Sequence, residues 1–438
     1  MDFFSQHPVY REYEKFKQSQ WKSSGEIRSL QRIKLETLFA HATQHVPYYR
    51  DIFSKLHQNS IESFDAIPLL DRDILRDNFL GITAENMGPS DRHIKTSSGT
   101  TGKPVKFYLD NRLIALCRAV EKRANFEWTG APFFGRKVIL WGLLGKERKT
   151  FQFMGEWLRK RWMFFYHKSS DEQIGQYVKK IGHIKPHFIL GYASALRRTA
   201  DYMLENNITS MRPHSILSGS EVLTPDTRSL VEEAFGCKVY NYYGSAEFGY
   251  IANECPHGNL HVNAERVYLE IVSNGKVLPP GEEGDIVITD LDNFAFPMIR
   301  YAIGDRGILS RESCPCGRGL PVLQSILGRS IDYIKTPSGL PIRVSNVLSE
   351  LFRVINTNKQ IKAAQVIQTA LNAVIIRIIP GDTFTPDTES KGLSALRSIL
   401  TEDIIISFEY VSNIEAAPSG KTRPFISHIT SSSSGGTT

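Results

Sequence analysis

The sequence predicts an α/β protein with a large N-terminal domain, residues 1–330, and a small mobile α+β domain, residues 331–430. Between residues 93 and 330, apolar runs such as KVILWGLLG and PHFILGYAS alternate with amphipathic stretches, as strands alternate with helices. The run VYLEIVSNGKVLPPGEEGDIVITDL (267–291) instead predicts antiparallel hairpins, within a β-rich module at about 250–330. After residue 330 the pattern changes to a compact mixture of helices and strands.

The individual elements follow from local patterns. Residues 1–80 are expected to be helical, most clearly in the amphipathic run 27–46 (IRSLQRIKLETLFAHATQHV). SILSGSE and CKVYNYYGSAE are further strand candidates, and SALRRTADYMLENN and TPDTRSLVEEAFG are helix candidates. In the second of these helices, Thr224-Pro225 supplies an N-cap and a first turn. In the C-terminal domain we expect helices in VSNVLSELFRVI and SKGLSALRSILT and strands in AAQVIQ, NAVIIRIIP and IIISFEYV, and the tail, 431–438, is expected to be disordered.

Composition and charge narrow the class of protein. The 438 residues are 41% hydrophobic and 23% charged, which is ordinary for a soluble protein of two or three domains. The net charge of +7 suits a small anionic substrate or weak membrane-surface attraction, and no nucleic-acid reader motif is present. The basic and aromatic stretch WLRKRWMFF (157–165) could touch lipid headgroups but is expected to be one helix with a solvated face. Without a signal peptide or a long apolar run, we expect a cytoplasmic monomer or homodimer with no stable membrane insertion and no nucleic-acid partner.

The stretch TSSGTTGKPVKFY, from Thr96 to Tyr108, is rich in small hydroxyl residues and glycine. Such a loop folds tightly around an anion, so that backbone N–H groups, hydroxyls and a lysine face its oxygens. It is not the common G-x-x-x-x-G-K-[ST] loop, because Pro104 stands at the Ser/Thr position. The alternative is a flexible hairpin turn, but turns are usually richer in Asn, Asp and Pro than in Thr. We therefore interpret the stretch as a phosphate-binding loop.

Three later motifs each end on one charged residue. YYGSAE places Glu247 after a strand, where a carboxylate can hold a divalent cation on phosphate oxygens. RYAIGD ends on Asp305, a residue type that can hydrogen-bond ribose hydroxyls, and Gly420 lets Lys421 project from PSGKTRPF. Taken singly, each has a plainer alternative: a surface glutamate, a turn aspartate and a solvated lysine.

Three of the five cysteines are candidates for a metal site. Cys314-Pro-Cys316 is one pair, and Cys255 lies within ECPHGNLH, next to His257 and His261. Three thiols and one imidazole suit tetrahedral zinc, and the alternative is reduced, buried cysteine. We choose His261 as fourth ligand because His257 is so close to Cys255 that chelation would be cramped, and His257 stays the alternative. The remaining two, Cys117 and Cys237, are interpreted as structural.

Taken together, the Ser/Thr/Gly loop, Y-G-S-x-E, R-Y-x-x-G-D, G-R-x-x-D and a late G-K resemble the motifs of the adenylate-forming superfamily of acyl-CoA synthetases. HVPYYRDIF, IPLLDRDILRDNF, SSGTTGKP, MIRYAIGD and CPCGRGLPVLQSILGR are similar to the phenylacetate–CoA ligase family, in its branch linked to capsular polysaccharide synthesis. The resemblance covers residues 35–428. It implies activation of a carboxylic acid by ATP to an acyl-adenylate, with release of pyrophosphate, followed by acyl transfer to a thiol (coenzyme A or a carrier protein) or an amine.

The resemblance also implies roles for individual residues. The ATP phosphates would be bound by the phosphate-binding loop, through Ser97, Ser98, Gly99, Thr100, Thr101, Gly102 and Lys103. Of these, Thr100 would be a catalytic residue. The adenine would be held by two segments: Gly219, Ser220 and Glu221, and Asn241, Tyr242, Tyr243, Gly244 and Ser245. Glu247 would hold magnesium, and Asp305 and Arg329 would bind the ribose hydroxyls. Lys421 would reach the α-phosphate and the carboxylate from the C-terminal domain, and some members of the family carry a zinc at the cysteine cluster.

Two departures from the family pattern are visible. Asp332-Tyr333 stands where the family often has two adjacent acids at the hinge, and residues before 35 match poorly. Two other functions stay open: an amide-forming adenylating ligase of surface polysaccharide or secondary metabolite biosynthesis, and a non-catalytic scaffold, against which intact Lys421 and Glu247 argue. The acid pocket is expected between VILWGLLG and NYYGSAE. Trp141, Tyr192 and Tyr242 could line it, which mildly favours an aromatic or flat acid. The alternative is that these aromatic residues belong to the core, which is the commoner case.

Overall fold

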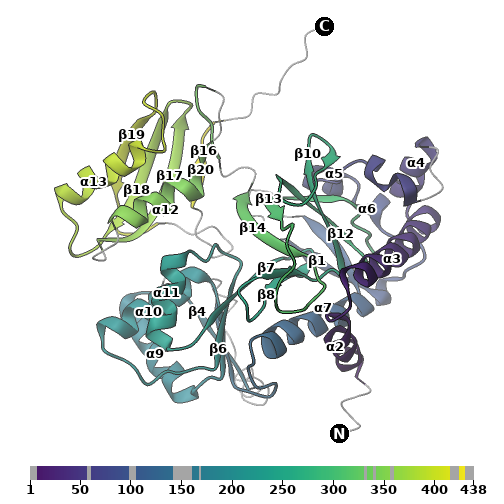
Figure 1. The fold of residues 1–438 in the computed structure, drawn as a ribbon, viewed down its shortest axis with the longest axis horizontal. Coiled ribbons are helices and arrows are strands. Elements are labelled where there is room, and N and C mark those ends of the chain that lie inside the picture. Colours follow the sequence, from purple (N-terminus) through teal and green to yellow (C-terminus); the bar gives the residue numbers. More distant parts are fainter. Residues whose placement is uncertain are drawn as a thin grey trace. The chain divides into compact units, whose positions relative to one another are not determined.

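The computed structural model describes residues 7–56, 61–97, 105–141, 160–166, 169–329, 333–338, 342–355, 360–414 and 424–429. The chain forms two compact units, which divide between Ile326 and Leu327 (Figure 1). Within the described ranges, no helix combines the length and the apolar character needed to cross a membrane.

The first unit opens with the predicted helices. They are α2 (Pro8–Ser19), α3 (Ser24–His45), α4 (Pro47–Lys55), the 3₁₀ turn η1 (Ile61–Ala66), α5 (Arg72–Asp77) and α6 (Phe79–Ile82). The longest helix, α3, begins at a capping box, in which the Ser23 hydroxyl accepts from Glu26 N–H and the Glu26 carboxylate accepts from Ser23 N–H. Its apolar positions, including Ile27, Leu35 and Leu38, lie in the core of this unit. The helical reading of the N-terminal region is therefore confirmed for the described part.

In the described part of the first unit, one sheet joins twelve strands in the order β11-β10-β12-β13-β14-β9-β8-β7-β6-β5-β3-β4. The strands are β3 (Lys137–Trp141), β4 (Arg161–Phe165), β5 (Phe188–Gly191), β6 (Ser215–Gly219), β7 (Val239–Ser245), β8 (Gly249–Glu254), β9 (Leu260–Val262), β10 (Val267–Ser273), β11 (Lys276–Val277), β12 (Glu283–Asp290), β13 (Tyr301–Leu309) and β14 (Val322–Arg329). The five strands from β4 to β7 pair in parallel, and β8 returns antiparallel to β7. Strand β7 is thus the boundary between the α/β half and the hairpin half.

The two faces of the parallel strands pack against different helices. One face, with Val138, Ile189 and Ile216, packs with the helices α9 (Asp171–Ile184), α10 (Ala193–Glu205) and α11 (Pro225–Phe235). The other face, with Ile139, Leu217 and Tyr242, packs with Phe126 of the π-helical turn η3 (Arg123–Trp128), which continues α7 (Asn111–Lys122). A separate two-stranded sheet, β1 (Arg92–Thr96) with β2 (Lys106–Asp110), precedes α7. Alternating residues therefore serve two cores, as buried parallel strands require.

Turn chemistry confirms two local predictions. The Thr224 hydroxyl accepts from Thr227 N–H, 3.4 Å away, and α11 begins at Pro225. Strands β10 and β11 are joined by Asn274 and Gly275, whose φ angles of 50° and 77° match the hairpin turn that favours this dipeptide.

One sequence prediction is wrong. WLRKRWMFF was interpreted as a helix, but its described part, Arg161–Phe165, is the edge strand β4, paired in parallel with β3. The stretch is aromatic as well as basic, and aromatic residues suit a half-buried strand. Met163 and Phe164 pack on opposite faces of the sheet, so the alternation of burial, rather than a solvated helical face, explains the pattern.

The second unit contains the predicted helices and strands. Helix α12 (Val344–Ile355) and α13 (Pro386–Arg397) accompany a four-stranded sheet in the order β19-β18-β17-β20. These strands are β17 (Ile361–Ala370), β18 (Ala373–Pro380), β19 (Ile405–Tyr410) and β20 (Phe425–Ser427), and a short pair, β15 (Tyr333–Ile334) with β16 (Ile342–Arg343), precedes them. Its core combines Val347 and Leu351 of α12 with Ile376 of β18 and Leu396 of α13. Of these elements, only β15, β16 and β20 were not predicted.

A buried ion pair in the first unit predicts a pH dependence of stability. Arg300 Nη2 lies 3.1 Å from Glu270 Oε1, both side chains are 1% exposed, and burial raises the pKa of the Glu270 carboxyl to about 7, although Arg300 opposes this. Because the folded protein then binds more protons than the unfolded chain between pH 4.5 and 7, this carboxyl's contribution to stability falls as pH rises through that window. Urea unfolding at pH 5 and pH 8 should show a smaller pH effect in Glu270→Gln than in the parent. An equal pH effect in both proteins would contradict the raised pKa.

Candidate active site and metal centre

The carboxyl ends of β5, β6 and β7 form the edge at which most of the described motif residues lie. In open parallel sheets, ligands bind beyond this edge. Gly219 ends β6 and Ser220 follows it, Tyr243 and Ser245 lie in the last part of β7, and Glu247 follows in the turn to β8. The fold therefore gathers two of the predicted nucleotide-binding segments on neighbouring strands.

Tyr243 and Asp305 are in direct contact. The Tyr243 hydroxyl donates to Asp305 Oδ2 over 2.7 Å, which joins the end of β7 to β13. Gly304 precedes the aspartate with φ of 87°, a backbone conformation that other residues rarely adopt. The two motifs YYGSAE and RYAIGD thus meet in space although they are far apart in the chain.

Tyr242 points to the other face of β7. A Cβ atom at position 219 would overlap the Tyr242 ring, so glycine at this position leaves room for the tyrosine. The Tyr242 and Ser220 hydroxyls lie 3.4 Å apart, and Ser220 has φ of 66°. The Tyr242 ring is stacked on Tyr250, with centroids 4.2 Å apart. The two adjacent tyrosines therefore belong to different surroundings, and of the pair only Tyr243 contacts Asp305.

Other predicted adenine-site residues make structural contacts. Glu221 accepts from Ser194 N–H, 2.9 Å away, at the beginning of α10. Asn241 N–H donates to Glu254, and the Ser245 hydroxyl accepts from Phe248 N–H. A Cβ at Gly244 would overlap the Gly249 carbonyl, so glycine permits the close approach of β7 and β8.

Glu247 is buried beside an arginine that the motif analysis did not single out. The side chain of Glu247 is 3% exposed, and its Oε1 lies 4.0 Å from Arg72 Nη2. Among the residues that the structure describes, Glu247 Oε1 has no hydrogen-bond partner. Arg72 begins α5, two residues after Leu70, whose backbone pairs with Arg300 and Ala302 around Tyr301. The R-Y-x-x-G-D motif therefore also positions Arg72 opposite Glu247, and only the tertiary fold reveals this pairing.

The phosphate loop is described only at its two ends. Ser97 and Val105 form two hydrogen bonds, from Ser97 N–H to the Val105 carbonyl and from Val105 N–H to the Ser97 hydroxyl, each 2.9 Å long. Ser97 is 6% exposed. Arg329 ends β14, and its side chain is not described. Outside the described residues lie Ser98, Gly99, Thr100, Thr101, Gly102, Lys103 and Lys421.

The three aromatic residues expected to line the acid pocket lie at the same edge. The ring centroids of Trp141, at the end of β3, and Tyr192, just after β5, are 4.3 Å apart. Burial, with smaller contributions from Glu221 and Tyr242, raises the pKa of Tyr192 well above its usual value. These interactions place Tyr192 between Trp141 and the Tyr242 side of the sheet.

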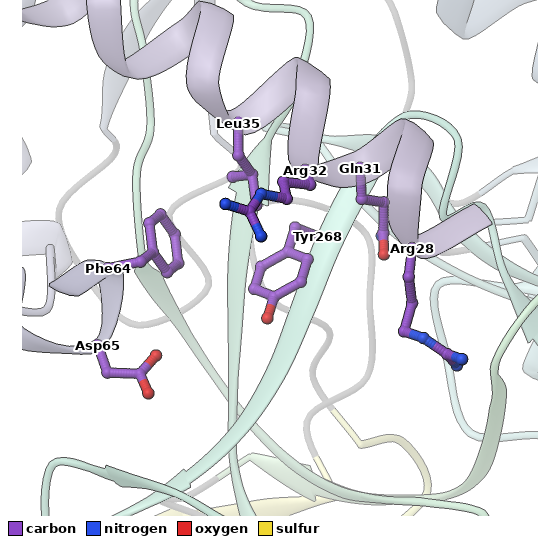
Figure 2. Close-up of a pocket in the computed structure, with 7 residues that line it drawn as sticks. All are labelled: Arg28, Gln31, Arg32, Leu35, Phe64, Asp65 and Tyr268. Atoms are coloured by element: carbon purple, nitrogen blue, oxygen red, sulfur yellow. The ribbon is translucent and has the colours of Figure 1, made fainter. Parts of the chain in front are cut away.

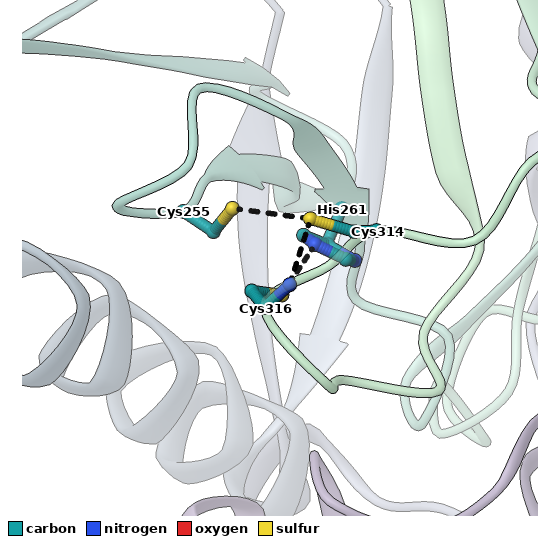
Figure 3. Close-up of side chains that lie close together, drawn as sticks. All are labelled: Cys255, His261, Cys314 and Cys316. Atoms are coloured by element: carbon teal, nitrogen blue, oxygen red, sulfur yellow. Dashed lines mark hydrogen bonds between the residues drawn. The ribbon is translucent and has the colours of Figure 1, made fainter.

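The four predicted metal ligands converge (Figure 3). Cys255 follows β8 and His261 lies in β9, while Cys314 and Cys316 lie in the loop from β13 to β14. Their ligand atoms all lie within 4.8 Å of one another. The sulfurs of Cys255 and Cys314 are 3.7 Å apart, and Cys316 Sγ is 3.3 Å from His261 Nε2. The fold thus brings together two halves of a candidate site from separate hairpins.

This geometry fits a tetrahedral ion better than a disulfide. Metal–ligand lengths typical of zinc give edges of about 3.8 Å between two sulfurs and about 3.5 Å between sulfur and nitrogen. A disulfide would require about 2.05 Å between sulfurs. His261 Nδ1 lies 3.0 Å from the Leu320 carbonyl, which directs the Nε2 lone pair to the thiols. Burial lowers the pKa of His261 to about 4, so the ring is neutral and able to bind a metal.

The metal candidate is packed against the beginning of the chain. Arg318 Nε donates to Gln20 Oε1 over 2.9 Å, and Trp128 Nε1 donates to the same oxygen over 2.7 Å. The Arg318 guanidinium lies 4.5 Å from the Trp21 ring centroid and 4.8 Å from that of Trp128. Gln20 is fully buried. This layer was not predicted, because the sequence pattern did not link residues before 35 to the cysteine loop.

A cavity of about 320 Å³ lies elsewhere in the first unit (Figure 2). It is lined by one side of α3 together with η1 and β10: Arg28, Gln31, Arg32, Leu35, Phe64, Asp65 and Tyr268. None of the motif residues lines it, so it does not contribute to the candidate site.

Comparisons with known proteins agree with the motifs and the fold. Residues 334–428 match the family described as the CapK C-terminal domain. The chain is 24% identical to protein CapK of Staphylococcus aureus, over 98% of this chain and 94% of that protein. This match extends beyond the expected range of 35–428.

Two enzymes are also similar to the chain. It is 27% identical to phenylacetate-coenzyme A ligase of Thermus thermophilus, over 75% of this chain and 76% of the ligase. The structure of 2-hydroxyisobutyryl-CoA ligase in the postadenylation state, in complex with R3-HIB-AMP, superposes with a TM-score of 0.73 at 20% identity, over 94% and 91% of the two chains. The chain is therefore similar in sequence to CapK and to the phenylacetate-coenzyme A ligases, and it has the fold of an adenylate-forming CoA ligase.

Proposed function

We propose that the protein is an ATP-dependent ligase that converts a carboxylic acid to an acyl-adenylate with release of pyrophosphate. It then transfers the acyl group to a thiol, such as that of coenzyme A, or to an amine. The observation that carries this proposal is the pairing of the two motif ends, Tyr243 with Asp305, beside buried Glu247 at the carboxyl edge of the sheet. Relatives named as coenzyme A ligases support the reaction class.

The chemistry explains why such residues are needed. A carboxylate is a poor electrophile, and attachment of AMP gives it a good leaving group. Two anions must be held together, and the charge on the α-phosphate must be neutralised. In the proposed site, the 97–103 loop binds the phosphates, Asp305 and Arg329 bind the ribose, and Lys421 supplies a positive charge at the reacting centre.

Magnesium fits the surroundings of Glu247. A buried carboxylate oxygen without a described hydrogen-bond partner is a suitable oxygen ligand, and Arg72 at 4.0 Å offsets part of its charge. Bound magnesium would neutralise phosphate charge. Glu247 would hold the ion, and Arg72 would keep the carboxylate in place when the ion is absent.

Zinc is proposed at the Cys255, His261, Cys314 and Cys316 cluster. Four soft or borderline donors, with no carboxylate among them, suit a closed structural site rather than a catalytic one with a bound water. The ion would pin the β8–β9 turn to the loop before β14. A cytoplasmic location and the oligomeric state stay predictions from the sequence.

The test of the proposed function is release of pyrophosphate. The purified protein is incubated with ATP and magnesium and a panel of acids that includes acetate, 2-hydroxyisobutyrate, phenylacetate and amino acids. We expect release that depends on both ATP and one class of acid. Subsequent addition of coenzyme A or an amine then identifies the acceptor by mass spectrometry of the product. Absence of release with every acid would favour a non-catalytic scaffold.

Asp305→Ala is expected to raise KM for ATP by about tenfold while kcat changes less than threefold. The ribose is remote from the reacting atoms, so its hydrogen bonds act alike in the ground and transition states. Tyr243→Phe is the matched control, since it removes the 2.7 Å hydrogen bond to Asp305 but keeps the carboxylate, and it should have a smaller effect. Steady-state kinetics in ATP measure both variants. A large fall in kcat at constant KM would contradict the ribose role.

A further inference from the structure

A π-helical turn lies behind the tyrosines of the candidate site. The turn η3 (Arg123–Trp128) continues α7, and such widened turns are rare and often occur at functional sites. It places Asn125, which is 1% exposed, beside Tyr250 of β8. The Tyr250 hydroxyl donates to Asn125 Oδ1 over 3.2 Å, and Asn125 Nδ2 donates to Glu121 Oε1 over the same distance.

The same carboxylate receives a second donor from the sheet. Lys137 Nζ, at the beginning of β3, lies 3.2 Å from Glu121 Oε1. The amide of Asn125 is therefore fixed at both ends, by Tyr250 and by an ion pair. A buried amide is costly unless its groups are hydrogen-bonded, and a satisfied polar network specifies one orientation of its members.

Tyr250 transmits this orientation to Tyr242. The two rings are stacked, with centroids 4.2 Å apart and an angle of 21° between the planes. Burial raises the pKa of Tyr242 to about 12 and raises that of Tyr250 well above its usual value, so both hydroxyls are protonated at neutral pH. Tyr242 is buried, whereas Tyr250 keeps part of its surface exposed. Tyr250 and Trp141 both pack against the apolar cluster that contains Tyr242, and the Trp141 ring is tilted against that of Tyr192, with centroids 4.3 Å apart.

We propose that Asn125 is a positioning residue for the acid pocket, and that Tyr250, held by Asn125 against Tyr242, is the wall that limits the size of the acid. The inference rests on the proposed function, because it names the residues that select the substrate of that reaction. It predicts that loss of the hydrogen bond loosens acid binding, and that loss of the ring admits larger acids.

The hydrogen bond is tested with Asn125→Ala, Tyr250→Phe and the double variant, on the acid that the parent uses best. Each single variant is expected to raise KM for the acid by about fivefold, with KM for ATP within twofold of the parent. The double variant should resemble Asn125→Ala, because both single variants remove the Tyr250–Asn125 hydrogen bond and Asn125→Ala also removes the one to Glu121. Additive effects, or equal losses toward ATP and acid, would indicate a merely structural role and overturn the inference.

The wall is tested with Tyr250→Ala, using acetate and phenylacetate as probes. The ratio of kcat/KM for phenylacetate to that for acetate is expected to rise by about tenfold or more. Tyr240→Ala is the matched control, because Tyr240 packs on the same face of β7 two residues before Tyr242. The control should leave the ratio unchanged even where it lowers stability. An unchanged ratio in Tyr250→Ala, or an equal rise in both variants, would overturn the inference.

Direct binding separates this inference from the proposed reaction. If the parent releases no pyrophosphate with any acid, the reaction fails, and the dissociation constants of the two probe acids are then measured by calorimetry in the presence of ATP. A tenfold shift toward phenylacetate in Tyr250→Ala alone would still support the wall. Failure of Tyr250→Ala to bind either acid, or an unshifted ratio of dissociation constants, would overturn it.

Discussion

Lys421→Ala is expected to lower the rate of pyrophosphate release by about 100- to 1000-fold while ATP still binds with nearly parental affinity. In the proposed reaction, negative charge builds on the α-phosphate as the carboxylate attacks it. A fixed positive charge at that position interacts more strongly with the α-phosphate in the transition state than in the ground state. Loss of such a group typically costs several kcal/mol of transition-state stabilisation. The effect should therefore appear in kcat, with little change in KM for ATP.

Lys362→Ala is the matched control, because Lys362 is an exposed lysine of the same C-terminal unit, paired only with exposed Asp382 at 3.2 Å in the described structure. It should leave the rate unchanged. Pyrophosphate release is measured with the best acid of the panel, and ATP binding is measured by calorimetry. Lys421 lies outside the described residues, so this assignment depends on the motif PSGKTRPF alone. A Lys421→Ala variant that works at the parental rate would remove it.

Local chemistry made much of the fold predictable from the sequence. Helix α11 begins where Thr224 can cap it and Pro225 suits the first turn, and the β10–β11 hairpin turns where Asn-Gly allows positive φ. Both features depend on residues within a few positions of each other, so they can be predicted from one sequence. Strand β4 was missed because its five residues form a strand only by pairing with β3, and this pairing depends on the tertiary fold.

The residues of the candidate site also differ in whether local sequence or tertiary contacts reveal them. Glu247 and Asp305 could be proposed from the sequence because each closes a recognisable motif, and the candidate metal ligands could be proposed because three thiols and an imidazole suit zinc. Arg72, by contrast, lies in a helix with several charged neighbours, and nothing in its own segment distinguishes it from Arg76. Its place opposite Glu247 depends on the pairing of Leu70 with the strand that carries Asp305, which only the assembled sheet provides.

The residues before 35 were expected to match the family poorly, but the match to CapK includes them, and their contacts show what they contribute to the fold. Gln20 uses its amide fully: Oε1 accepts from Trp128 and Arg318, and Nε2 donates to Glu127 and to the Lys17 carbonyl. A Cβ at Gly319 would overlap the Lys22 carbonyl, so the cysteine loop and the start of α3 touch through their backbones. The candidate metal site therefore supports the N-terminal segment as well as the β-rich module.

The double variant Cys314→Ser/Cys316→Ser is expected to lose zinc completely. The contact between the cysteine loop and the N-terminal segment should then weaken. Two of four ligands disappear, and a structural zinc site contributes its binding energy to folding. Joining His261 to Cys314 also closes a long loop, which limits the unfolded chain. Elemental analysis should find about one zinc per parent chain and less than about a tenth in the variant. The tryptophan fluorescence should change, because Trp21 and Trp128 flank Arg318.

Cys117→Ser/Cys237→Ser is the matched control, because neither cysteine belongs to the cluster. It should retain zinc whatever its stability. Hydrogen exchange separates a local effect from general unfolding: the zinc-free variant should exchange faster in 17–24 and 314–320, while α9 and α10 of the opposite sheet face keep their protection. Parent protein that is prepared without chelator and holds less than about a tenth of an equivalent of zinc would rule out a tight site. Zinc-bound parent and zinc-free variant with the same exchange in 17–24 would show that the ion does not hold the N-terminal helices.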